Sequence, residues 1–243
     1  MFKYQKNYLL IIGISLFASI FTSCASNKHL HNPKDPFEPI NRGVYQFNKT
    51  LDALYINPIN QVYIKTIPQP LKQLVGNFFN NILEIPTIIN NLLQLKFEQA
   101  RNSTARFIIN TTLGIGGLFD MADKANLKSK KEDLGNTLYN WGYINSNFVM
   151  LPIIGPSTVR DSIGLIGNTF ISVPYYFKPK WRNRYQGSYM IHRRSELEEL
   201  QSLLKTVGVD EYAMLRDSYL QNRDYQLNLK NKDQSIQLDA PPE

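Results

Sequence analysis

The chain has 243 residues, a formal net charge of +7 and one cysteine, Cys24. A single thiol cannot form an intramolecular disulfide, so the fold depends on burial, for which this length is sufficient. The sequence lacks the H-E-x-x-H, C-x-x-C, dinucleotide-binding and Gly-x-Ser-x-Gly motifs. This argues against an enzyme, and we predict no catalytic residue, no metal ion and no cofactor.

Residues 1–23 have the layout of a secretory signal peptide. Two lysines precede Tyr8–Phe21, an uncharged stretch that is too short for a comfortable membrane span. The sequence Phe21-Thr22-Ser23-Cys24 resembles a bacterial lipobox. We therefore expect acyl chains on Cys24, which stabilise membrane association by about 0.8 kcal/mol per buried methylene, followed by a tether over 24–34. The alternative is an incidental cysteine behind an uncleaved anchor.

A first amphipathic helix is predicted to begin near Asp35. Asp35 is the expected N-cap, Pro36 suits the first turn and Glu38 suits the third position after the cap. Apolar residues then recur at spacings of three and four. Pro58 is predicted to end this helix because it lacks the amide hydrogen that the helical ladder needs. Pro68 is predicted to end the segment that follows.

The stretch Gly76–Leu95 is predicted to be a helix of unusual composition. One face is apolar, most of the other carries Asn, Gln and Thr, and Glu84 is the only charge. Pro86 predicts a kink in its middle. Because surface helices of soluble proteins usually carry Lys and Glu, this face suits a helix within a membrane interface, with its polar side lining a wet cavity. A core helix in a chain rich in Asn and Ile explains the pattern equally well.

The next helix is predicted over Glu98–Leu113, ended by Gly114 in a left-handed conformation. The turn Gly114–Gly117 lacks the lysine, the Ser/Thr and the preceding strand of a phosphate-binding loop, so close packing or a hinge is expected. Lys124–Asp133 is a charged excursion, expected outside any membrane. Phe148–Ile154 is expected to form a strand or one arm of a hairpin.

The remaining segments are helical in pattern. Ser162–Phe177 contains no charge, whereas Arg184–Val207 and Asp210–Asp224 have the alternation of conventional amphipathic helices. Residues 225–243 are expected to be a polar C-terminal tail. The sequence thus predicts an all-α domain over 35–224, whose charge-poor middle suggests a body partly sunk in a bilayer.

Six basic residues near the predicted helix after Phe177 have no acid between them. They are Lys178, Lys180, Arg182, Arg184, Arg193 and Arg194. Such a cluster can meet anionic headgroups or an acidic partner surface, or it can be solvated and balanced by counter-charges from elsewhere. Loss of residues 1–23 removes two lysines and lowers the net charge from +7 to +5. Nucleic acid is not an expected partner behind a secretion signal.

Several segments together resemble the MlaA (VacJ) family of outer-membrane lipoproteins. The matching segments are 35–42, 68–70, 77–78, 84–86, 106–111, 113–120, 135–138, 151–161 and the last predicted helix. The motif positions that we single out are Asp35, Pro36, Asn41, Arg42, Gly155, Pro156, Ser157, Arg160 and Asp161. Neighbouring Arg160 and Asp161 are expected to form a structural charge pair. Ser146-Asn147 stands where the family usually has Gly-Pro.

The resemblance implies a ring of amphipathic helices lying in the periplasmic leaflet of the outer membrane, around an amphipathic channel. It also implies removal of phospholipids from the outer leaflet and their transfer to the periplasmic carrier MlaC. A trimeric porin is the implied membrane partner. Under this interpretation phospholipid is the transported ligand, and the acyl chains on Cys24 hold the protein at the periplasmic face.

The uncharged amide face suggests which residues line the passage, because amides offer hydrogen bonds without trapping a charged headgroup. The candidates are Asn77, Asn81 and Asn91, with Gly114, Gly116 and Gly117 allowing close approach or movement. Two other functions stay open at this point. One is a structural envelope lipoprotein that binds a porin, and the other is a membrane lipid hydrolase.

Overall fold

A computed structural model describes residues 32–204 and 210–238. The predicted signal peptide over 1–23, the predicted lipidation site Cys24 and most of the tether therefore lie outside the described residues. In chain order the elements are α2 (Glu38–Leu51), α3 (Asn57–Thr66), α4 (Gln69–Ile82), α5 (Glu84–Leu93), α6 (Phe97–Thr112), α7 (Met121–Lys124), α8 (Leu134–Asn140), β1 (Phe148–Leu151), β2 (Gly155–Thr158), α9 (Val159–Ile171), α10 (Pro179–Leu204) and α11 (Glu211–Leu238).

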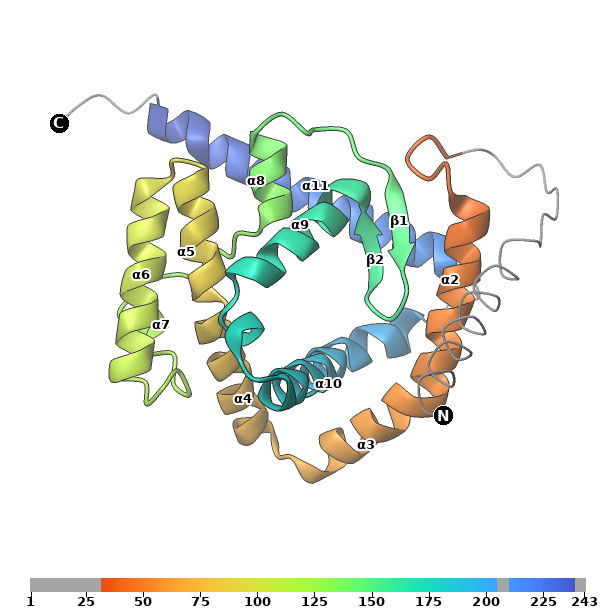
Figure 1. Ribbon diagram of the computed structural model, residues 1–243, viewed down its shortest axis with the longest axis horizontal. Helices are drawn as coiled ribbons and strands as arrows, with labels where there is room; N and C mark the ends of the chain where they lie inside the picture. Colours follow the sequence, from red (N-terminus) through yellow and green to blue (C-terminus); the bar gives the residue numbers. More distant parts are fainter. Residues whose placement is uncertain (1–31, 205–209, 239–243) are drawn as a thin grey trace, which may run out of the picture.

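The helices form a ring (Figure 1). α2, α3, α4 and α5 follow one another around its periphery, and α8 with the β1–β2 hairpin completes it. α10 crosses the interior, and α11 runs behind α8, α9 and the hairpin. The strands pair antiparallel, with Phe148 opposite Thr158 and Leu151 opposite Gly155. The predicted all-α, ring-like class with a short hairpin is confirmed.

The first long helix does not end at Pro58, so that prediction is wrong. α2 continues through a π-helical turn over Asp52–Ile56 directly into α3, where Pro58 lies in the first turn. In this turn the Asn57 amide bonds the Asp52 carbonyl, five residues back. The wider π-turn accommodates a proline ring that would clash with a regular helical carbonyl. Pro68 does mark a break, because α3 ends at Thr66 and α4 begins at Gln69.

The kink predicted from Pro86 is present. Leu83 separates α4 from α5, three residues before the proline. The prediction for Gly114 is wrong, because α6 ends without a left-handed residue there; Ile115, Gly116 and Gly117 have positive φ instead. α11 extends to Leu238, so the segment 225–238, expected as a tail, is helical.

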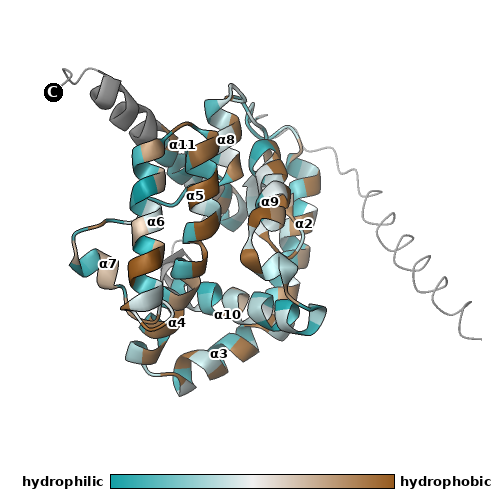
Figure 2. Ribbon diagram, turned by 60° about the vertical axis from the view of Figure 1, so that its left-hand side comes forward, coloured by the Kyte–Doolittle hydropathy of each residue, from teal (hydrophilic) through white to brown (hydrophobic). Residues whose placement is uncertain are grey.

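The distribution of polar and apolar side chains is inverted relative to a soluble globular protein. Among the described residues, twenty polar or charged side chains are buried, against eight hydrophobic ones. Large hydrophobic side chains are exposed on α2, the π-turn, α3, α6 and α9, including Leu54 of the turn, Val62, Ile108 and Ile166. Figure 2 shows hydrophobic and hydrophilic residues alternating along these helices. An exposed apolar surface of this extent indicates contact with lipid or with another protein.

The small apolar core lies beside the hairpin. Phe148, Met150, Tyr212 and Leu220 form it, and Val44 packs against it from α2. This cluster brings the beginning, the middle and the end of the domain together. Within the described residues, none of the helices has both the length and the hydropathy that crossing a bilayer demands.

Candidate functional site

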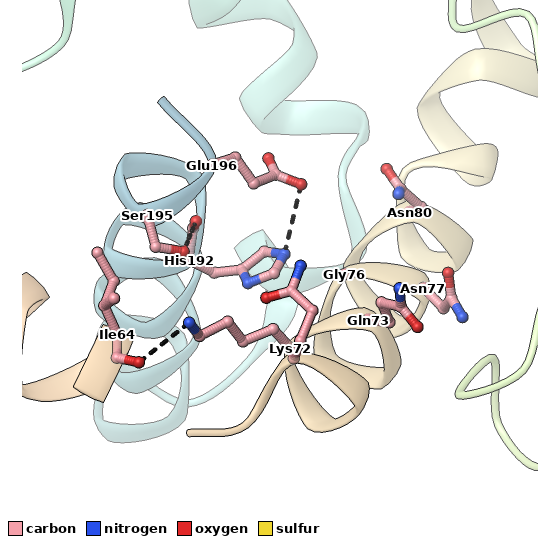
Figure 3. A pocket seen from close by; sticks show the side chains of 10 residues that line it. Ile64, Lys72, Gln73, Gly76, Asn77, Asn80, His192, Ser195 and Glu196 are labelled. Atoms are coloured by element: carbon pink, nitrogen blue, oxygen red, sulfur yellow. Dashed lines mark hydrogen bonds and ion pairs between the residues drawn. The ribbon is translucent and has the colours of Figure 1, made fainter. Parts of the chain in front are cut away.

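A polar cavity lies between α4 and the middle of α10, next to the end of α3. Its volume is about 490 Å³, within the range of small-molecule sites. Figure 3 shows Lys72, Gln73 and Gly76 of α4 on one side, and His192 and Glu196 of α10 on the other. The lining residues are Ile64, Gln69, Lys72, Gln73, Gly76, Asn77, Asn80, His192, Ser195 and Glu196.

Amide side chains form one stripe of this cavity. Gln69, Gln73, Asn77 and Asn80 line it at spacings of three and four residues, which places them on one face of α4. Asn77 is half-buried and donates a 3.0 Å hydrogen bond to the Leu118 carbonyl. Asn77, predicted to line a polar passage, therefore borders a cavity. Gln69 and Gln73 were not predicted as site residues, although helical spacing back from Asn77 points to both.

His192 is the most buried polar group of the cavity, with only 4% of its surface exposed. Its Nδ1 lies 3.1 Å from the Tyr63 hydroxyl, and its Nε2 makes no hydrogen bond to any described residue. Burial lowers the pKa of His192 below 6.5, although neighbouring Glu196 acts in the opposite direction. Burial thus favours the neutral form of the imidazole. Gly76 makes room for it, since a Cβ there would lie 2.9 Å from Nε2.

An aromatic groove of about 740 Å³ adjoins α4 and the start of α10. Phe78, Tyr176, Phe177, Trp181 and Tyr185 line it together with Phe79, Lys178, Arg184 and Ser188. The buried Phe79 ring lies 5.3 Å from the Tyr185 ring and 5.7 Å from the His192 imidazole. Phe79 thus stands between the aromatic groove and the polar cavity.

The basic cluster predicted from the sequence is divided in space. Lys178 and Arg184 border the aromatic groove, where the Arg184 guanidinium lies 5.0 Å from the Trp181 ring centre. Arg193 instead pairs with Glu196 at 2.7 Å, and Arg194 pairs with Asp52 at 2.8 Å. Arg193 and Arg194 thus have counter-charges, as expected if the basic residues are balanced by acids from elsewhere in the fold.

Two of the predicted passage residues are buried against neighbouring helices. Asn81 is 4% exposed and donates to Thr111 Oγ1 at 2.9 Å, and Asn91 is 1% exposed. Both amide atoms of Asn91 lack a hydrogen-bond partner among the described residues. Neighbouring Asn90 joins Asn168 and Thr137 at 3.0 and 2.8 Å. Asn81 thus connects α4 to α6, and Asn90 connects α5 to α8 and α9, inside the ring wall.

The glycine turn is a site of close packing. A Cβ on Gly114 would lie 2.2 Å from the Phe119 carbonyl oxygen, and one on Gly117 would lie 2.5 Å from Cβ of Asn81. Gly116, by contrast, faces open space. Of the two alternatives, close packing therefore describes Gly114 and Gly117.

The first group of motif positions joins α2 to α11. Asp35 was predicted to be the N-cap of the first helix, and this prediction is wrong. Its buried carboxylate instead accepts hydrogen bonds from side chains farther along the chain. Asn41, Tyr212 and Arg216 donate to it at 2.7, 2.6 and 3.3 Å. Arg42 pairs with Asp210 at 2.5 Å and lies 4.5 Å from the Tyr212 ring centre. Pro36 lies in the turn before α2.

A second group joins α8, α9 and α11. The Asp161 carboxylate pairs with Arg223 at 2.8 Å and accepts from the Tyr219 hydroxyl at 2.8 Å. Arg223 also pairs with Asp133 at 2.9 Å. Burial disfavours the Asp161 carboxylate, but Arg223 outweighs it and holds the pKa of Asp161 below its ordinary value. Arg160 and Asp161 form the expected pair at 3.2 Å.

The hairpin carries the remaining motif positions. Gly155 begins β2 with a φ of +103°, a conformation that favours glycine, and Pro156 lies opposite Met150. Ser157 is buried and bonds Ser162 at 3.1 Å. At the departure from the family pattern, Ser146 Oγ accepts from the Arg160 amide at 2.8 Å, which fixes the base of the hairpin to α9.

A buried charge network was missed by the sequence analysis. Glu84, 1% exposed, pairs with Arg106 at 3.1 Å and with Lys131 at 2.7 Å. Arg106 also pairs with Asp120 at 2.9 Å. Lys131 and buried Glu132 turn inward, so the segment Lys124–Asp133 is only partly the exposed excursion that we expected. Among the side chains that the structure describes, those of residues 32–196 and 210–227, no three His, Cys, Asp or Glu are grouped to hold a metal ion.

Taken together, the closed helical ring, the apolar exterior and the polar cavity define a lipid-handling protein of a membrane interface. Comparisons with known proteins agree. The family model described as MlaA lipoprotein matches residues 33–226. The chain belongs to the MlaA lipoprotein family.

Individual relatives extend this result. The chain is 30% identical over 230 residues to the intermembrane phospholipid transport system lipoprotein MlaA of Escherichia coli K12, covering 90% of this chain and 89% of that protein. It is 34% identical over 192 residues to an uncharacterised protein of Rickettsia bellii, covering 78% and 75%. A solved structure from work on the structural basis for maintenance of bacterial outer membrane lipid asymmetry superposes with a TM-score of 0.68. It is 30% identical in sequence and covers 79% of this chain and 98% of that one.

Proposed function

We propose that this protein is a non-enzymatic lipoprotein of the outer membrane that transports phospholipids between membranes and maintains outer-membrane lipid asymmetry. The observation that carries this proposal is similarity over nearly the whole chain to the E. coli transport lipoprotein, combined with the same ring fold. The transported ligand is phospholipid, which leaves the outer leaflet.

The surface of the ring supports this function. Exposed apolar side chains on the peripheral helices, such as Leu54 and Val62, are suited to hydrocarbon rather than to water. We propose that the ring lies in the periplasmic leaflet, held there also by acyl chains on Cys24. Removal of several such chains would weaken membrane binding greatly, because each buried methylene contributes about 0.8 kcal/mol.

The route for the lipid is proposed to pass between α4 and α10. A phospholipid needs a polar surface for its headgroup, since uncompensated charge in hydrocarbon costs several kcal/mol or more, and an apolar surface for its chains. The amide-lined cavity and the aromatic groove supply these two surfaces side by side. Asn77 belongs to this path, whereas buried Asn81, Asn91 and the glycine turn support its wall.

The proposed partners follow from the transport itself. A lipid that leaves the outer membrane needs a soluble carrier to cross the periplasm, and we propose that this carrier is MlaC. We also propose a trimeric porin as the neighbour of the ring. The exposed apolar surface supports a membrane-embedded partner as well as lipid.

Surface labelling of phosphatidylethanolamine tests the proposal. Intact cells are treated with an amine reagent that cannot cross membranes, and labelled lipid is compared among wild type, a deletion and Cys24→Ala. More labelled lipid in both mutants supports transport by an anchored protein. Unchanged labelling in the deletion contradicts it and favours a structural lipoprotein. Release of lysophospholipid or fatty acid by the purified protein would instead support a hydrolase.

A further inference from the structure

The polar cavity between α4 and α10 contains donors that no described residue satisfies. We assign the tautomer in which the Tyr63 hydroxyl donates to His192 Nδ1, 3.1 Å away, and the imidazole hydrogen lies on Nε2. This Nε2 is buried and makes no hydrogen bond to a described residue, and the His192 side chain belongs to the cavity lining. A buried donor without an acceptor is costly, so the site is suited to an acceptor brought by a ligand.

Lys72 supplies a positive charge to the same cavity. Its Nζ donates to the Ile64 carbonyl at 3.1 Å, and no carboxylate of the described residues pairs with it. The ammonium group has three donors, so two of them stay available. Together, Lys72 and His192 Nε2 present donors of the kind that bind a phosphodiester.

Glu196 gives the cavity an acceptor of opposite charge. Its Oε1 lies 3.7 Å from His192 Nε2, and its side chain is 44% exposed. Its Oε2 accepts from Arg193 at 2.7 Å. A net-negative headgroup would meet repulsion from this carboxylate, whereas a primary amine would be attracted to it. The amide oxygens of Gln73 and Asn80, which also line the cavity, are further acceptors for an ammonium group.

We propose that this cavity binds the headgroup of a zwitterionic, amine-bearing phospholipid such as phosphatidylethanolamine. Lys72 and His192 donate to the phosphate, and Glu196 accepts from the amine. The cavity thereby discriminates against anionic headgroups such as phosphatidylglycerol. This inference rests on the proposed transport function and adds to it a headgroup preference and the residues that set it.

The position of the aromatic groove fits this assignment. Phe79 separates the groove from the cavity, so a headgroup held by Lys72 and Glu196 has an apolar surface directly beside it. A free phosphate ester would use the cavity alone. The amphipathic arrangement therefore favours an intact lipid as the occupant.

The test uses the purified full chain in detergent and two probes, short-chain phosphatidylethanolamine and short-chain phosphatidylglycerol with identical acyl chains. We expect wild type to bind the ethanolamine lipid about tenfold more tightly, as one charge-assisted hydrogen bond allows. Glu196→Gln removes this preference by lowering the affinity for the ethanolamine lipid. Lys72→Met lowers the affinity for both lipids. The matched controls Glu98→Gln and Lys124→Met, at exposed positions of α6 and α7 that do not line the cavity, leave both affinities unchanged.

Competition with soluble compounds identifies what the site recognises. Glycerophosphoethanolamine displacing the lipid better than inorganic phosphate supports the proposal, whereas equal displacement makes the cavity a simple anion site and overturns it. Equal affinity of wild type for the two lipids also overturns it. In that case a rise in surface labelling on deletion would leave the transport function standing. Wild type that binds neither lipid, with unchanged labelling on deletion, would refute both.

Discussion

The Tyr212 hydroxyl donates a 2.6 Å hydrogen bond to the Asp35 carboxylate across a sequence separation of 177 residues. Asp35 precedes the first described helix, and Tyr212 lies in the last one. Arg216 and Asn41 complete the partners of this carboxylate, which is 1% exposed. The ring is thus closed by a buried polar contact between its two ends. The motif positions of the chain therefore serve mainly to hold the elements of the ring together.

Removal of the Tyr212 hydroxyl should weaken this closure. Tyr212→Phe keeps the ring that packs on Phe148 but leaves the Asp35 carboxylate one donor short. A hydrogen bond to a charged group contributes about 1.5–3 kcal/mol, and for a chain of this size each kcal/mol lowers the melting temperature by roughly 2–4 °C. Thermal unfolding in detergent, followed by circular dichroism, measures the shift. Tyr225→Phe, at a residue 64% exposed on the same helix, is the control. Equal melting temperatures for the two variants would contradict the closure.

The pair between Asp161 and Arg223 predicts how stability depends on pH. Because Arg223 overcomes the effect of burial, the pKa of Asp161 in the folded chain lies below its ordinary value of 3.8. As the pH falls, Asp161 is therefore protonated in the unfolded chain at a higher pH than in the folded chain. The stabilisation is complete well above about pH 4 and is lost as the pH drops through the folded pKa.

Comparison with Asp161→Asn isolates this effect. At pH 7 the variant should unfold at a lower temperature than wild type, and the difference should shrink below about pH 4. Asp224→Asn, at a carboxylate whose side chain is 55% exposed, serves as the control and should stay close to wild type. A difference for Asp161→Asn that is constant from pH 7 to pH 3 would show that the ion pair is not its source.

Gly114 should tolerate no side chain. A Cβ there would meet two backbone oxygens, those of Phe119 and Asn110, at 2.2 and 2.4 Å. Overpacking of this kind costs typically about 1–3 kcal/mol, so Gly114→Ala should lower the melting temperature. Gly187→Ala, in the middle of α10 with nothing within 4 Å, should be neutral or stabilising because alanine favours the helix. Equal effects of the two substitutions would argue against close packing at the turn.

Arg106→Leu should be strongly destabilising. It would leave Glu84, with 1% of its surface exposed, without its buried partner, and Asp120 without its guanidinium. Breaking a buried pair from one side costs about 3–5 kcal/mol. Arg101→Leu, at a side chain 81% exposed on the same helix, should change stability by no more than about 0.5 kcal/mol. Denaturant titration in detergent compares the two variants.

Local pattern predicted most of the helices and the hairpin, because apolar spacing and proline positions act over a few residues. Pro58 shows where this reasoning fails. A π-turn that begins at Asp52 changes the hydrogen-bond register before the proline, and residue types do not reveal that register.

The candidate site was predicted less completely. The uncharged face of α4 and α5 pointed to Asn77, which borders the cavity. Side chains assigned to one face of a helix nevertheless point in directions that differ by tens of degrees. Asn81 and Asn91 point into the ring wall as a result, and the cavity lies toward Gln69 and Gln73. Contributions from His192 and Glu196 depend on how α10 crosses α4, a relationship between distant segments that a single sequence does not contain.

Obstruction of the cavity tests directly whether phospholipid passes between α4 and α10. Gln73 is exposed and lines the cavity, so Gln73→Trp adds bulk there without disturbing the packed interior. Gln46→Trp makes the same exchange at an exposed position of α2. Surface labelling of phosphatidylethanolamine is measured on intact cells that produce each variant in equal amounts. We expect Gln73→Trp to raise labelling toward the level of the deletion, whereas Gln46→Trp should match wild type. Wild-type labelling with Gln73→Trp would contradict this route.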